Sequence, residues 1–204
     1  MSNIVTTSQC YECGHNMEGR VEDYRYLESG LRSVVLHNIL IFRCAHCGAE
    51  VPQIVAASEL HRHIAMLLLA KGTRLTGEEF RFLRKVVGYS ATELAEQLGT
   101  SKAVVSRWET KAAFGKEAEQ VFRMLCVLRL TMEVVKEMGS EDAAKAQECA
   151  NRLRSATESA IASLKGLKVA DNKKRPTPLK IQIDTESLLP GLISQTATAG
   201  CSIQ

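Results

Sequence analysis

Apolar residues in the middle of the chain recur every three or four positions, which is the spacing of one face of an α-helix. The first such stretch follows Ser58, which can cap it, and stops at Lys71-Gly72. The second opens with the capping box Thr76-Gly77-Glu78-Glu79 and stops at Gly88. The inward residues are Leu60, Ile64, Leu67 and Leu68 in the first helix and Phe80, Leu83 and Val87 in the second.

Two shorter helices follow, joined by a turn that contains glycine. Ser90-Ala91-Thr92-Glu93 is another capping box, and it opens a helix whose inward residues are Leu94, Ala95 and Leu98. After Gly99, a helix over 102–110 directs Val105 and Trp108 toward the core. Ala95 is small enough to let the two helices cross closely. This arrangement predicts a helix-turn-helix, whose second helix enters a DNA groove.

The outward positions of that second helix are the candidate DNA contacts. Arg107 is the best base contact, because its guanidinium can donate two hydrogen bonds to O6 and N7 of guanine. Contacts to phosphate set register and affinity but carry little sequence information. The predicted DNA-binding residues are Thr100, Ser101, Lys102, Ala103, Ser106 and Arg107, of which Thr100, Ser101 and Lys102 are expected at phosphates. The alternative is a plain helical bundle with a solvated charged face.

Near the N-terminus the apolar pattern changes to short stretches of alternation. Tyr24 and Tyr26 form one such run, and Val35, Ile39 and Ile41 form the next. Glu28-Ser29-Gly30 separates the runs and predicts a turn. A β-ribbon of this size is too small to be stable on apolar burial alone, so we expect a bound ion to couple to its folding.

The candidate for that ion site is a set of four cysteines in two CxxCG units. Cys10 and Cys13 lie in CYECG, and Cys44 and Cys47 lie in CAHCG. A gap of two residues lets both thiolates of a pair face one ion, and the following glycine permits the tight turn. A four-thiolate shell with no open position suits a structural Zn²⁺. The alternatives are four reduced structural thiols, or a thiol switch that responds to oxidants.

The remaining histidines and cysteines are weaker candidates. His15 and His46 lie beside the CxxCG units and are expected to be solvated loop residues, although either can replace a cysteine as ligand. Cys126 and Cys149 fall within helical apolar patterns and are expected to be small core residues, and Cys201 stands apart. The odd total of seven cysteines argues against a disulfide framework.

The last third of the chain predicts two helices and a strand. The helix over 117–138 has apolar residues on more than one face, so one side can pack on the helix-turn-helix and the rest can meet a second copy. Those residues are Val121, Phe122, Leu125, Leu128, Val134 and Val135. A second helix over 140–164 carries a stripe of mostly alanine, and Lys173-Lys174-Arg175 lies in a polar linker. Leu179, Ile181 and Ile183 alternate with polar residues and predict a strand, which must pair with its twin, bind a partner or stay disordered.

Composition places the chain among globular proteins and excludes a large catalytic barrel. It has 204 residues and a net charge of +3, with −2 in 1–57 and +4 in 71–130, which suggests two surfaces with different partners. The longest apolar run has seven residues, so no segment is expected to span a membrane. The N-terminus lacks the pattern of a signal peptide, which predicts a cytoplasmic protein, associated with the nucleoid when bound to DNA.

Two segments resemble known families. ATELAEQLGTSKAVVSRWE resembles the Cro/repressor-type (XRE) helix-turn-helix. Together with LTGEEFRFLRK and the two CxxCG units, it resembles the MqsA-type antitoxins with their YgiT-type zinc finger, over roughly residues 10–130. The resemblance implies that the N-terminal zinc module binds a toxin, often an mRNA interferase, and that the C-terminal domain dimerises and represses its own operon. It also implies that the four cysteines are the ligands and Arg107 contacts bases.

The sequence therefore predicts a mainly α protein with a small N-terminal β module like a zinc ribbon and a Cro/repressor-type helix-turn-helix. The expected domains are a zinc module (1–57), a connecting helix and linker (58–75), a DNA-binding domain (76–138), an accessory or dimer helix (139–170) and a tail (171–204). We expect a homodimeric repressor of a palindromic operator in double-stranded DNA, acting as an antitoxin.

The main rival is a stand-alone regulator whose zinc site is structural or senses metal or oxidants. A structural adaptor is a third possibility, and no set of residues suggests an enzyme.

Overall fold

The computed structural model describes residues 6–111, 114–138, 151 and 176–184. It divides into two compact units. The first, here called the sheet unit, comprises Met1–Glu28, Arg32–Leu60 and Lys180–Gln204, and the second, the helical unit, comprises Ser29–Leu31 and His61–Leu179. The described part of the chain contains five α-helices and one sheet, which confirms a mainly helical protein with a small N-terminal β module.

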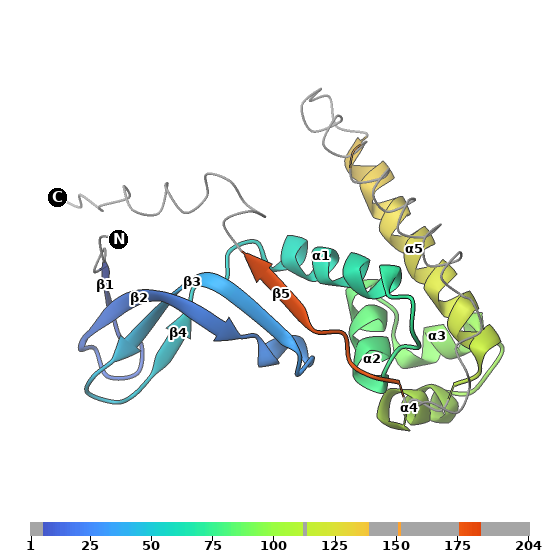
Figure 1. Cartoon of the computed structure of the whole chain (residues 1–204), viewed down its shortest axis with the longest axis horizontal. Helices are drawn as coiled ribbons and strands as arrows, with labels where there is room; N and C mark the ends of the chain where they lie inside the picture. Colours follow the sequence, from blue (N-terminus) through green and yellow to red (C-terminus); the bar gives the residue numbers. More distant parts are fainter. Residues whose placement is uncertain (1–5, 112–113, 139–150, 152–175, 185–204) are drawn as a thin grey trace. The chain divides into compact units, whose positions relative to one another are not determined.

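The sheet unit is a twisted antiparallel sheet that gains one strand from the far end of the chain. Its strands are β1 (Thr6–Gln9), β2 (Asn16–Arg25), β3 (Val34–Cys44), β4 (Glu50–Pro52) and β5 (Ile181–Asp184). The first four lie in the order β1-β2-β3-β4, each antiparallel to the next. β5 lies parallel to β3, with Val34 opposite Ile181 and Leu36 opposite Ile183 (Figure 1). The predicted C-terminal strand therefore forms, and its partner is within the same chain.

The two-residue alternation of β3 changes phase in the middle of the strand. Val34 and Leu36 are buried before the change, and Ile39 and Ile41 are buried after it. Asn38 lies between them with φ of 59°, and the pairing of β2 with β3 shifts register between Glu22 and Tyr24. An extra residue of this kind moves all later side chains to the opposite parity. The prediction that Val35 shares a face with Ile39 and Ile41 is therefore wrong, and Val35 is only half-buried.

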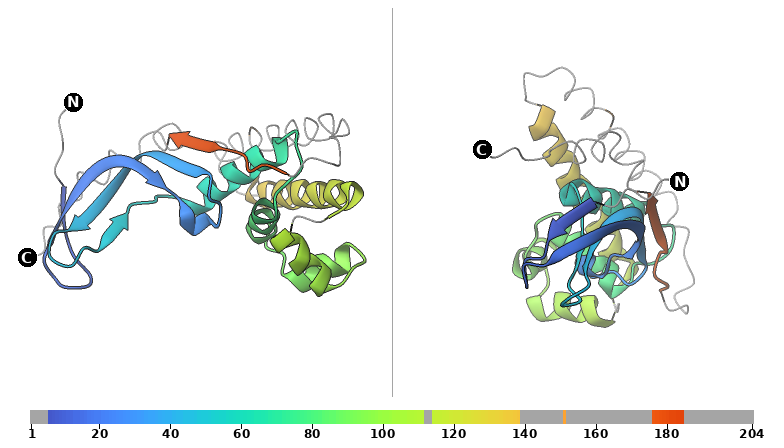
Figure 2. Two further views of the ribbon diagram at one scale, coloured as in Figure 1. Left: turned by 60° about the horizontal axis from the view of Figure 1, so that its bottom comes forward. Right: turned by 90° about the vertical axis from the view of Figure 1, so that its left-hand side faces the viewer.

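The helices are α1 (Ala57–Ala70), α2 (Gly77–Val86), α3 (Ala91–Gln97), α4 (Lys102–Lys111) and α5 (Lys116–Met138), with a short 3₁₀ helix, η1 (Leu27–Ser29), between β2 and β3. Both predicted capping boxes are present: Thr76 with Glu79 opens α2, and Ser90 with Glu93 opens α3. Figure 2 shows α2, α3 and α4 from two further sides.

The start of α1 differs from the prediction. The helix begins at Ala57, and the carbonyl oxygen of Ala56 accepts the amide of Leu60 at 3.0 Å. Ser58 therefore lies inside the first turn and does not cap the helix. Ile64 and Leu68 are buried as expected, whereas Leu67 is exposed.

The core of the helical unit is built around Phe80. Its ring lies 4.1 Å from Phe122, 5.2 Å from Phe114 and 5.9 Å from Trp108, measured between ring centroids. Leu83 and Val87 are buried, and so is Cys126, which confirms its prediction as a small core residue.

Several other predictions fall outside the described residues. These are Cys149 and Cys201, the helix over 140–164 apart from residue 151, the triplet Lys173-Lys174-Arg175, and the side chains of Val134 and Val135.

Candidate functional site

Two matching turns bring the four cysteines of the sheet unit together. In the turn between β1 and β2, the amide of Cys10 donates to the His15 carbonyl and the amide of Gly14 donates to the Cys10 carbonyl, both at 2.8 Å. The turn between β3 and β4 repeats the pattern, with Gly48 donating to Cys44 at 2.9 Å. Gly14 and Gly48 have φ of 73° and 75°, a conformation that favours glycine.

The four sulfur atoms have the spacing that a tetrahedral metal ion requires. The Sγ atoms of Cys10 and Cys47 lie 3.5 Å apart, as do those of Cys13 and Cys44, and all four lie within 4.8 Å of one another. A tetrahedron with metal–sulfur bonds of about 2.3 Å has sulfur–sulfur edges of about 3.8 Å. The cluster can therefore hold a metal ion, and its donor set fits zinc.

The local environment lowers the pKa of Cys44 and raises the pKa of Cys13. The backbone amides of Cys47 and His46 lower the pKa of Cys44 to about 6. For Cys13, the amide of His15 lowers the pKa, but burial and the neighbouring thiols outweigh it and raise the value to about 12. Cys44 therefore ionises far more readily than Cys13. A divalent cation is the natural partner for four thiolates in this space.

His15 and His46 do not form a second metal site in this arrangement. Their exposed rings stack with centroids 3.8 Å apart and planes at 8°, although Cys13 and both histidines lie within ligand distance of one another. A metal binds imidazole nitrogen in the plane of the ring at about 2.1 Å. An ion in the plane of one stacked ring is more than about 3 Å from the plane of the other, so both rings cannot bind it.

The second candidate site lies in the helical unit, on α4. Gly99, with φ of 60°, makes the turn from α3, and the amide of Thr100 closes it by donating to the Ala95 carbonyl at 2.8 Å. Leu94, Ala95 and Val105 are buried at the crossing of the two helices. The predicted outward residues are all exposed: Lys102, Ala103, Ser106 and Arg107. Ser101 is exposed and accepts the Val104 amide at 3.4 Å, which caps α4, whereas Thr100 is half-buried.

The C-terminal end of α4 is held by α2, through residues that the sequence analysis missed. Glu109 accepts a hydrogen bond from Arg84 at 2.5 Å and forms an ion pair with Arg81 at 3.7 Å. Gly77, the first residue of α2, lies against the backbone of Trp108 and Glu109, and a Cβ atom there would meet the Glu109 oxygen at 2.3 Å. The sequence feature that could have indicated this close contact is the glycine inside the capping box, a position at which a side chain is usually tolerated.

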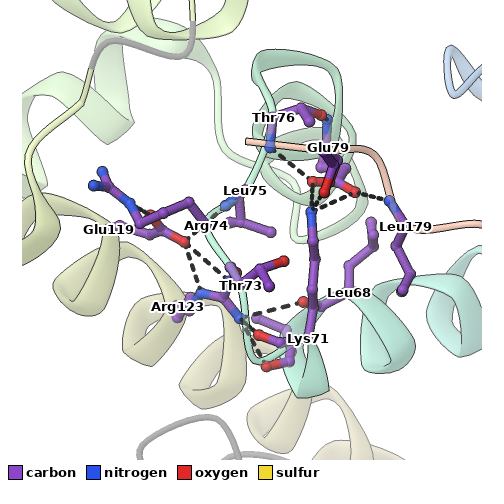
Figure 3. A network of polar contacts seen from close by, with 12 residues as sticks. Leu68, Lys71, Thr73, Arg74, Leu75, Thr76, Glu79, Glu119, Arg123 and Leu179 are labelled. Atoms are coloured by element: carbon purple, nitrogen blue, oxygen red, sulfur yellow. Dashed lines mark hydrogen bonds and ion pairs between the residues drawn. The ribbon is translucent and has the colours of Figure 1, made fainter. Parts of the chain in front are cut away.

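A buried charged network, also missed, fixes the loop between α1 and α2. Arg123 on α5 donates to the carbonyl oxygens of Leu69 and Lys71, both at 3.0 Å, and pairs with Glu119 at 2.9 Å (Figure 3). Glu119 also accepts the Leu75 amide at 2.9 Å. The side chains of Arg123 and Glu119 are both buried. Their spacing of four residues within an apolar helix was the available signal.

The cysteines belong to the sheet unit, whereas the α4 residues belong to the helical unit. Scans against protein-family models, curated proteins and solved structures find no match to this chain. Among the described residues, no helix combines the length and the apolar character that crossing a membrane requires.

Proposed function

We propose that this chain is a sequence-specific DNA-binding repressor in which α3 and α4 form a Cro/repressor-type helix-turn-helix. The observation that carries the proposal is the exposed face of α4, which presents Lys102, Ser106 and Arg107 while Val105 anchors the opposite face. Arg107 contacts a guanine, and Lys102 contacts phosphate. The ion pair between Glu109 of α4 and Arg84 of α2 fixes α4, so the exposed side chains project from a rigidly placed helix.

The proposed repressor is a homodimer that binds a palindromic operator. Support comes from α5, where Val121, Met124, Leu128 and Met132 are each 49–62% exposed. Their spacing of three and four residues forms one apolar stripe, about 16 Å long at 1.5 Å per residue. A second copy of the same stripe is a natural cover for it, because a two-fold interface uses the same patch on both subunits. The two α4 helices would then enter successive major grooves about 34 Å apart.

The proposed biological role is that of an antitoxin, with zinc as the ion of the cysteine cluster. The support is the combination, in one chain, of a four-cysteine sheet unit and a basic helical segment, which resembles the MqsA-type antitoxins. In this proposal the zinc module binds the toxin and the helical unit represses the operon. Recovery of the chain from native extract without a small basic ribonuclease would favour a stand-alone regulator.

The test of DNA recognition begins with sequencing of the DNA that co-purifies with the native protein. Affinity for that operator and for scrambled DNA is then measured for the parent, for Arg107→Ala and for Arg20→Ala. Arg20 is the control, since it is a highly exposed arginine in the sheet unit. Arg107→Ala should weaken operator binding by about 1–3 kcal/mol and relax preference at one base pair per half-site. Equal affinities of Arg107→Ala and the parent for both DNAs would refute the assignment.

A further inference from the structure

The C-terminal segment Pro176–Leu179 is held in the helical unit by a buried ion pair. Lys71 Nζ lies 3.0 Å and 2.7 Å from the two carboxylate oxygens of Glu79, and the two side chains are only 4% and 2% exposed. Each partner also binds the main chain of the segment (Figure 3). Lys71 Nζ donates to the Thr177 carbonyl, and the Leu179 amide donates to Glu79 Oε1, both at 2.7 Å.

This contact recognises backbone rather than side chains. In an extended segment, the carbonyl of one residue and the amide two residues later face the same side. Lys71 supplies one donor and Glu79 supplies one acceptor to that side, as a neighbouring strand would do. The side chains of Thr177 and Pro178 are exposed and do not carry the contact.

The same carboxylate starts helix α2. Glu79 is the last residue of the capping box, and its Oε2 accepts the Thr76 amide at 2.7 Å, while Thr76 Oγ1 accepts the Glu79 amide at 3.2 Å. Removing the segment would take a donor from Glu79 and an acceptor from Lys71. Both are buried charged groups, so the loss of either partner is costly, and the first turn of α2 would loosen.

The first turn of α2 in turn bears on α4. Gly77 approaches the backbone oxygen atoms of Trp108 and Glu109 so closely that a Cβ atom would lie 2.9 Å and 2.3 Å from them. Because the main chains of α2 and α4 are in direct contact here, no side chain can change conformation to accommodate a displacement of α2. A shift of the first turn of α2 is therefore passed to the C-terminal half of α4.

We propose that residues 176–179 are a regulatory segment whose docking on the Lys71–Glu79 pair positions α4 and thereby sets the affinity for DNA. The effect on DNA rests on the proposed function of α4, whereas the positioning of α4 does not. The segment is a positioning element and does not itself contact DNA.

The test uses the full chain with Leu179→Pro, which removes the amide that Glu79 accepts. Thr177→Ala is the matched control, because only the carbonyl of Thr177 takes part. Hydrogen exchange of the backbone amides is measured in parent and variants, together with affinity for the co-purifying DNA. In Leu179→Pro, exchange should rise about tenfold or more in residues 76–80 and in the last turn of α4, and DNA affinity should fall at least fivefold, whereas Thr177→Ala should match the parent.

Faster exchange in Leu179→Pro confined to the segment itself, with α2 and α4 unchanged, would overturn the proposal. Loosening of α2 and α4 in a chain that binds no DNA would support the positioning of α4 and overturn only the proposed function. Should Leu179→Pro fail to fold, exchange in the parent decides the question. If docking of the segment and the first turn of α2 are coupled, the free energies of opening obtained from hydrogen exchange should be the same for the Leu179 and Thr76 amides. Clearly different values would overturn the proposal.

Discussion

Substitution of Gly77 by alanine tests the close packing of α2 on α4. The added Cβ would lie 2.3 Å from the Glu109 oxygen, 2.7 Å from the Glu109 carbonyl carbon and 2.9 Å from the Trp108 oxygen. All three are backbone atoms, so no side-chain rotation relieves the contact. Ordinary contact begins near 3.4 Å, so the two helices must separate by about 1 Å.

The magnitude follows from two opposing effects. Forcing an extra methyl group into a packed contact costs about 1–3 kcal/mol. Replacing glycine by alanine in a helix gains at most about 1 kcal/mol, and less at the first position, where Gly77 lies. The expected net loss in the free energy of unfolding is therefore about 1–2 kcal/mol. Operator affinity should also fall, because α4 is displaced.

Urea unfolding followed by tryptophan fluorescence measures this loss, because Trp108 is the single tryptophan and lies at the contact. With a urea slope of about 1–3 kcal/mol/M, the midpoint of Gly77→Ala should fall by about 0.3–2 M. Gly72→Ala is the matched control, since a Cβ atom at Gly72 meets nothing within 4 Å. A midpoint for Gly77→Ala at or above that of Gly72→Ala would refute the reasoning.

Three further predictions concern the other contacts. The intact protein should contain one metal ion per chain, and either removal of this ion by a chelator or Cys44→Ser should unfold the sheet unit and leave the helical unit folded. Hydrogen exchange of the backbone amides measures both units. Full protection of β2 and β3 without metal would contradict this prediction. Arg123→Met should cost about 1–3 kcal/mol in urea unfolding, because the buried carbonyls of Leu69 and Lys71 lose their donor while Glu119 keeps Arg74 as an ion-pair partner. Arg129→Met, which removes an exposed cation over Tyr89, should cost under about 1 kcal/mol. Leu128→Glu should convert the proposed dimer to monomer in sedimentation, and an unchanged mass would argue against the α5 stripe as the interface.

The features that the sequence predicted well depend on neighbouring residues. The capping boxes of α2 and α3 form because a hydroxyl and a carboxylate three residues apart reach each other whenever the first turn forms. The two CxxCG turns are also set by neighbouring residues. Because all four cysteines offer the same ligand atom, a single four-thiolate metal site is the one plausible way for the two turns to combine. The outward face of α4 followed from helical period alone, since Val105 fixes which side is inward.

Tertiary structure alone decided the partner of the C-terminal strand, the phase change at Asn38, and the burial of Arg123 and Glu119. Local periodicity predicts that Ile181 and Ile183 share a face, but it does not identify the strand that they pair with. The edge of β3 beside Val34, to which β5 adds, exists only after β2, β3 and β4 have paired. The spacing of Arg123 and Glu119 shows that they can pair, but it does not show that they are buried, because the cost of burial is offset by partners far along the chain, such as the carbonyls of Leu69 and Lys71. Short-range geometry is determined by short-range sequence, whereas the pairing of distant polar groups is determined by where the chain brings them.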